Sequence, residues 1–104
     1  MLLTNLSSIP GKEIDILGLV DGEVVFSKHF GKDLAAGFKN IAGGELKGYT
    51  EMIADAKNRA LKRLEERASD LGADGVLNIQ YSITNMQQGS ALVVLATGTA
   101  IKFK

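Results

Sequence analysis

One stretch of the sequence, from Thr50 to Leu71, constrains the fold more than any other. Apolar residues recur there at spacings of three and four, which aligns them along one side of an α-helix; they are Tyr49, Ile53, Ala56, Ala60, Leu64, Ala68 and Leu71. Thr50 is a suitable N-cap, and Gly72 is a suitable helix stop because glycine easily adopts the left-handed conformation. We therefore expect one amphipathic helix of about 33 Å, at ~1.5 Å per residue.

The residues before this helix alternate between strand-forming runs and turn signals. Residues 13–20 and 23–28 are rich in β-branched and other apolar residues, and Asp21-Gly22 between them has the chemistry of a two-residue turn. We favour a hairpin here over one long strand with a glycine bulge. Lys32 to Ala42 shows helical spacing, and Gly43-Gly44 should end that short helix.

Two strands are expected after the long helix. In 76–84 the apolar residues alternate with polar ones, which predicts a strand covered on one face; the apolar set is Leu77, Ile79, Tyr81 and Ile83. Residues 91–103 have apolar side chains on both faces for much of their length, with Gly98 as a bend or bulge point. We predict a single α+β domain over 1–104, a small antiparallel β-sheet packed by one long helix.

The doubly apolar last strand leads to an expectation about assembly. One helix can cover only one face of a small sheet, so the second apolar face of 91–96 has no evident cover within the chain. Contiguous exposed apolar surface usually marks an interaction site, and another copy of the chain is the simplest cover. We therefore predict a homo-oligomer.

Composition narrows the classes of function. The chain has 12 basic and 12 acidic residues and no cysteine. A net charge of zero argues against non-specific electrostatic binding to nucleic acid or acidic membranes. Without cysteine there is no disulfide, thiolate nucleophile or cysteine-ligated zinc. The sequence shows no targeting segment and no apolar run of membrane-spanning length, so we expect a cytoplasmic protein without nucleic-acid or membrane partners.

The candidate chemical groups are few. His29 is the single imidazole, and Asp33 follows at a spacing that can pair two metal ligands on a helix. One histidine and one aspartate are too few for a closed metal site in one chain, although symmetry could multiply them. A structural or solvent-exposed histidine is the favoured interpretation. Gly43-Gly44-Glu45 and Gly48 precede a helix, as in phosphate-binding loops, but the Walker and dinucleotide spacings are absent, so we interpret them as a structural loop.

An ordered set of short motifs resembles the YbjQ-like family of small uncharacterised proteins over the whole chain. The set comprises Met1-Leu2-Leu3-Thr4, Gly18-Leu19-Val20-x-Gly22, Gly43-Gly44, Tyr49, Leu71-Gly72-Ala73-Asp74 and Gly98-Thr99-Ala100. The resemblance implies a β-α-β-β subunit of dodecin-like arrangement that assembles as a ring, as a homopentamer. It also brings a heavy-metal-binding label, which the absence of cysteine and the single histidine support poorly, because soft metals prefer thiolate and imidazole.

Three hypotheses about function follow. The leading one is a non-enzymatic, ring-forming protein with no identifiable cofactor, which leaves ligand binding at subunit interfaces open. The alternative is a metal-binding protein that uses His29 with carboxylates from symmetry-related chains. The third, an enzyme with an active site at an interface, requires Tyr49, Asp74 or His29 to converge. The family pattern at Gly43, Gly44, Gly72, Ala73, Gly98 and Thr99 is interpreted as backbone geometry.

Overall fold

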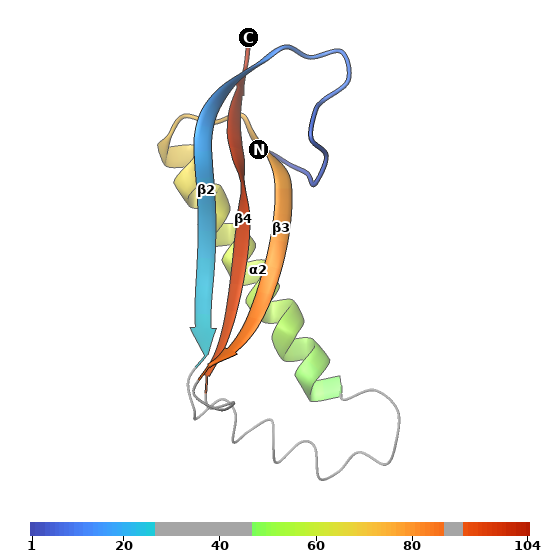
Figure 1. The fold of residues 1–104 in the computed structure, drawn as a ribbon, viewed down its shortest axis with the longest axis vertical. Helices are drawn as coiled ribbons and strands as arrows, with labels where there is room; N and C mark the ends of the chain where they lie inside the picture. The colour runs from blue at the N-terminus through green and yellow to red at the C-terminus, as the bar shows by residue number, and fades with distance from the viewer. Residues whose placement is uncertain (27–46, 87–90) are drawn as a thin grey trace.

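The computed structural model describes residues 1–26, 47–86 and 91–104 (Figure 1). Its elements are strands β1 (Leu2–Leu3) and β2 (Ile14–Phe26), helix α2 (Lys47–Asp70), and strands β3 (Gly75–Met86) and β4 (Ala91–Phe103). They form one four-stranded sheet in the order β1-β3-β4-β2. The three long strands pair antiparallel, as predicted, but β1 pairs parallel with β3, so the sheet is mixed. The short helix expected over 32–42 lies outside the described residues.

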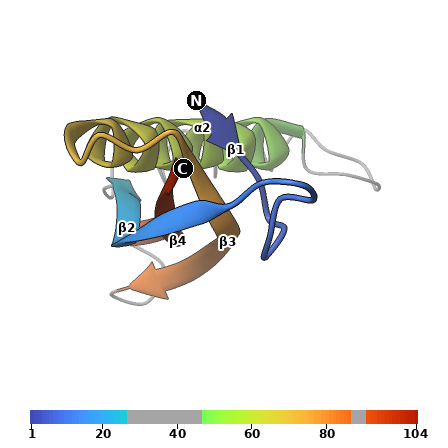
Figure 2. The same ribbon diagram turned by 90° about the horizontal axis from the view of Figure 1, so that it is seen from above.

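Helix α2 packs against one face of the sheet, as the end-on view in Figure 2 shows. The buried side of the helix contains Met52 and four fully enclosed members of the predicted stripe, Ala56, Ala60, Leu64 and Ala68. Leu71, predicted as the last member of the stripe, instead follows the end of α2 at Asp70 and is 51% exposed. Val94, Ala96 and Ala100 of β4 face it from the sheet. Three alanines in the stripe keep the helix close to the strands, and Gly22 of β2 lies against the helix backbone at Ala60. None of the helices within the described residues combines the length and apolar character needed to cross a bilayer.

The C-terminal end of α2 is fixed by the predicted glycine. Gly72 has a φ of 79°, in the left-handed region. The Gly72 N–H donates to the Ser69 carbonyl at 2.9 Å, and the Ala73 N–H donates to the Ala68 carbonyl at 3.1 Å. This pair of bonds is a Schellman motif, which satisfies carbonyls that the last turn of a helix leaves unpaired. At the other end the helix begins at Lys47, so Thr50, expected as the N-cap, lies inside the first turn.

The hairpin prediction at Asp21-Gly22 is wrong. Residues 14–26 form one continuous strand, in which Asp21 pairs with Thr97 and Gly22 pairs with Ala96. The irregularity is a register shift between Ile16 and Gly18, where Gly18 has a φ of 130°. The weaker alternative, a long strand with a glycine bulge, is the correct one. Gly22 serves close helix packing instead of a turn, because a side chain there would collide with α2.

Strand β3 contains a bulge that the alternating sequence pattern conceals. Asn78 has a φ of 55°, and the register with β4 shifts between Leu77 and Gln80. Leu77 pairs with Thr99 and Tyr81 pairs with Ala96, three residues apart along β4. Directly paired residues share a face and faces alternate along a strand. Leu77 and Tyr81 therefore point to opposite faces, whereas the sequence pattern predicted the same face for both.

Candidate functional site

The sheet face opposite α2, called the far face below, carries exposed aliphatic side chains. On β2 these are Ile16, Leu19 and Val25, whose side chains are 73%, 89% and 60% exposed. Val25 pairs with Val93 of β4, and both Val93 and the nearby Leu95 are only half-buried. Isolated surface aliphatics are ordinary, but a set aligned along two paired strands is typical of an interaction surface.

Sequence reasoning expected this apolar surface on the last strand and overlooked β2. Val93 and Leu95 do lie on the far face, as predicted, yet the more exposed residues belong to β2. The reason is the wrong hairpin prediction. Once β2 is one strand, its odd-numbered residues from Leu19 to Val25 alternate onto the far face. The signal was present in the spacing of Leu19 and Val25, because residues an even number of positions apart on one strand share a face.

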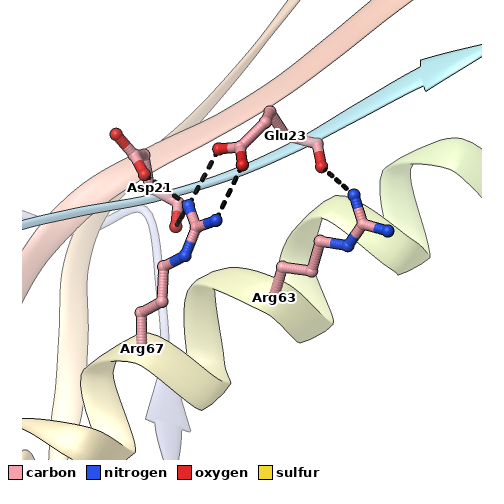
Figure 3. Close-up of polar contacts among 4 residues, drawn as sticks. All are labelled: Asp21, Glu23, Arg63 and Arg67. Atoms are coloured by element: carbon pink, nitrogen blue, oxygen red, sulfur yellow. Dashed lines mark hydrogen bonds and ion pairs between the residues drawn. The ribbon is translucent and has the colours of Figure 1, made fainter.

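Two acidic residues on the same face of β2 are held by arginines of α2 (Figure 3). The guanidinium of Arg67 donates two hydrogen bonds to the Glu23 carboxylate in a bidentate arrangement, with N···O distances of 2.8 and 2.7 Å. The Nη1 atom of Arg67 also lies 2.6 Å from Asp21 Oδ1 and donates to the Asp21 carbonyl at 3.0 Å. Bidentate arginine–carboxylate pairs are stronger and more specific in geometry than single contacts.

This arginine cluster has an electrostatic and a structural effect. The hydrogen bond from Arg67 lowers the pKa of the Glu23 carboxyl, and the same pairing raises the pKa of the Arg67 guanidinium. Arg63 donates to the Glu23 backbone carbonyl, so two carbonyls of β2, those of Asp21 and Glu23, accept hydrogen bonds from the helix. Strand β2 lies at the end of the sheet order, and capping edge carbonyls discourages pairing with a foreign strand.

Few of the predicted metal-site and active-site residues belong to the described part of the chain. His29, Asp33, Gly43 and Gly44 lie outside the described residues. Tyr49 belongs to the first turn of α2, but its side chain is outside the described part. The metal pairing of His29 with Asp33, and the convergence of His29 with Tyr49 or Asp74, therefore remain predictions.

The other family-pattern residues have structural roles. Gly72 ends α2, and Ala73 packs against the core. Asp74 accepts a hydrogen bond from the Phe103 N–H at 2.8 Å, and its own N–H donates to Ile101. A side chain on Gly98 would stand 2.5 Å from Val76 Cγ1, so this glycine permits close packing of β3 on β4. Thr99 lies on the far face, paired with Leu19 and Leu77.

Within residues 1–26, 47–86 and 91–104 there is no group of three or more histidine, aspartate or glutamate side chains placed to hold a metal ion. The acidic residues of the arginine cluster are already engaged by guanidinium groups. The described residues thus form a small α+β fold in which α2 covers one sheet face and exposed aliphatic side chains lie on the other.

The chain belongs to the YbjQ family. The family model, described as "Putative heavy-metal-binding", matches residues 1–104. This confirms the family assignment made from the ordered motifs.

Two similar relatives of the chain carry the name UPF0145 protein. One from Clostridium tetani is 52% identical over 104 residues, which cover 100% of this chain and 98% of that protein. Another from Thermotoga maritima is 49% identical over 105 residues, with the same coverage. The fold is also similar to a crystal structure of a protein of unknown function from Pediococcus pentosaceus, assigned to the DUF74 family. That similarity has a TM-score of 0.71 at 20% identity and covers 100% of this chain and 98% of the other. These comparisons establish family and fold without a specific activity.

Proposed function

We propose that the chain is a subunit of a homo-oligomer assembled through the far face, with a binding or structural role instead of a catalytic one. The observation that carries the proposal is the line of exposed aliphatics on β2, with Leu19 at 89% exposure as its most accessible member. Burying such side chains stabilises an interface by about 25 cal/mol per Å² of apolar surface removed from water.

The charges on the far face are compatible with binding of a second copy of the chain to this face. Asp21 and Glu23 lie between Leu19 and Val25, so a second copy that covers the far face must also cover these two carboxylates. Arg67 of the same subunit compensates both carboxylates. The acidic residues therefore oppose self-association much less than free carboxylates would. The net charge of zero also favours self-association, because two copies of the chain do not repel each other through a large net charge.

The finer form of the proposal is the ring of five implied by the family resemblance. A ring requires a head-to-tail contact, in which the far face of one subunit meets a different surface of the next. Such a contact creates repeated clefts between subunits, and these are suitable places for ligand binding.

Substitution of Leu19 tests the interface. Leu19→Lys places a charge at the centre of the proposed contact and should reduce the mass measured by light scattering toward that of one chain. Leu71→Lys is the matched control, because Leu71 is also an exposed leucine but lies at the end of α2. It should leave the mass unchanged. Equal masses for Leu19→Lys and the parent protein, with both folded by circular dichroism, would contradict the far face as the interface.

Metal binding is the second candidate, favoured by the description of the family model. His29 and Asp33 from several subunits of a ring would supply imidazole and carboxylate ligands that one chain lacks. Elemental analysis of untagged protein, together with melting curves in Zn²⁺, Ni²⁺ or Cu²⁺, tests this candidate. Specific binding must raise the melting temperature, and His29→Ala must abolish the increase. If none of the three ions changes the melting temperature, the metal-binding hypothesis is contradicted.

A further inference from the structure

A hollow of about 540 Å³ opens between α2, β3 and the first residues of the chain. This volume falls within the range typical of small-molecule sites. Its apolar walls are Leu3, Leu61 of α2 and Ile79 of β3, and Tyr81 adds an aromatic ring. Tyr81 pairs with Ala96, a core residue under α2, so the hollow opens on the helix side of the sheet and is separate from the far face.

The β3 bulge shapes this hollow. At Asn78 the strand interrupts its pairing with β4 and turns its N–H toward the N-terminal segment instead. The Asn78 N–H donates to the Leu6 carbonyl at 2.9 Å, and the Ile79 N–H donates to the Thr4 carbonyl at 3.1 Å. These bonds hold Thr4–Leu6 beside β3. Bulges often re-aim side chains at binding sites, and this one orients Tyr81 toward the helix side.

The polar lining consists of groups that can donate hydrogen bonds. Asn5 carries an amide and Thr4 carries a hydroxyl. The Thr4 hydroxyl oxygen already accepts a hydrogen bond from the Leu6 N–H at 3.1 Å. Its own proton can therefore be donated to a ligand oxygen. No carboxylate is among the residues that line the hollow.

The cation Lys57 lies beside the aromatic wall of the hollow. The ammonium of Lys57 stands 5.0 Å from the centroid of the Tyr81 ring, a cation–π contact. Lys57 and Leu61 are four residues apart on α2 and so share a side of the helix. Among the residues that the structure describes, no carboxylate forms an ion pair with Lys57, whereas Arg59 and Arg67 on the same helix are paired. No described carboxylate therefore compensates the positive charge next to the hollow.

We propose that this hollow binds a small organic anion with an apolar body, such as a medium-chain carboxylate. The apolar part would contact Leu61, Ile79 and the Tyr81 ring. The carboxylate would meet the Lys57 ammonium. Charge-assisted hydrogen bonds are about twice as strong as neutral ones, so the anionic group should dominate the selectivity.

Fluorescence with 1-anilinonaphthalene-8-sulfonate, an aromatic sulfonate, tests the proposal in the full chain. Titration should give saturable binding, and decanoate should displace the dye at concentrations well below those required for 1-decanol. Lys57→Met should weaken dye binding by about tenfold, the loss expected for one charge-assisted contact, and Lys57→Arg should restore most of it.

A far-face variant separates this site from the proposed oligomer interface. Leu19→Lys should leave dye affinity unchanged, even where it alters the mass of the assembly. Loss of dye binding in Leu19→Lys with full binding in Lys57→Met would assign the dye to the far face and overturn the proposal. Equal displacement by decanoate and 1-decanol would also overturn it, as would the absence of saturable binding.

Discussion

Gly22 of β2 lies against the backbone of α2 at Ala60, where a Cβ atom on the glycine would stand only 2.1 Å from the Ala60 carbonyl oxygen. The Leu64 amide nitrogen would be 2.5 Å from the same atom. The obstacle is helix backbone, which cannot rotate away as a side chain can. This contact sets the distance between α2 and the edge strand, and it places Arg63 and Arg67 within reach of Asp21 and Glu23.

Gly22→Ala should therefore be strongly destabilising. The added methyl must push α2 away from β2, which we expect to lower the free energy of unfolding by about 2–3 kcal/mol, as for other overpacked sites. Urea unfolding at one fixed protein concentration measures the change. Gly11→Ala is the control, because a Cβ there meets nothing within 4 Å. Its φ of 75° still costs roughly 1–2 kcal/mol for a non-glycine residue. A smaller loss for Gly22→Ala than for Gly11→Ala would contradict the close packing.

The arginine cluster should make stability depend on pH in the acidic range. The hydrogen bond from Arg67 lowers the folded-state pKa of Glu23 below its ordinary value of 4.5. A lowered pKa contributes stability that is fully present above the unfolded value and is lost as the pH falls through the folded one. Arg67→Gln should thus destabilise the protein at pH 7, and the difference from the parent protein should narrow below about pH 4.

Carboxyl NMR titration checks the same point directly. The Glu23 resonance should titrate below pH 4.5 in the parent protein and at a higher pH in Arg67→Gln. Arg59→Gln serves as the control, because Arg59 pairs with Asp55 within α2 and does not reach β2. It should leave the Glu23 titration unchanged. An unaltered Glu23 pKa in Arg67→Gln would show that the bidentate pair of Arg67 with Glu23 does not form in solution.

The bulge at Asn78 predicts that substitutions there will rank in stability in the opposite order from that expected in a regular strand. A β-branched residue normally favours a strand, yet Asn78→Val should lower the free energy of unfolding by roughly 1–2 kcal/mol because its φ is 55°. Asn78→Gly should be tolerated, since glycine adopts positive φ without strain. Thermal melts compare both with Ser82→Val, an exposed position of regular β3 structure that should gain or lose little. Greater stability of Asn78→Val than of Asn78→Gly would exclude the bulge.

Helix α2 could be predicted from sequence because its signals are local. The stripe of Ala56, Ala60, Leu64 and Ala68 and the stop at Gly72 needed no knowledge of the rest of the chain. The same reliance on local signals produced the wrong hairpin prediction at Asp21-Gly22. The local chemistry of a turn and that of a close helix contact both favour glycine, and only the position of Ala60 across the fold distinguishes them.

The two candidate surfaces were harder to predict because each combines distant segments. The far face depends on the register of β2 against β4, which set Leu19 beside Thr99 and Val25 beside Val93. The hollow requires Leu61 and Tyr81 to meet the N-terminal residues, and the bulge that joins them lies inside a strand with regular alternation. Asn78 was the available signal, since asparagine is enriched at positive φ.

The mass of the untagged parent protein in solution tests the central claim, association through the far face, most directly. Light scattering coupled to size exclusion, repeated over a dilution series at micromolar concentrations, gives this mass without a label. We predict a multiple of the 11.1 kDa chain, close to five copies if the ring implied by the family resemblance is correct. A mass of 11.1 kDa throughout the series would contradict the account.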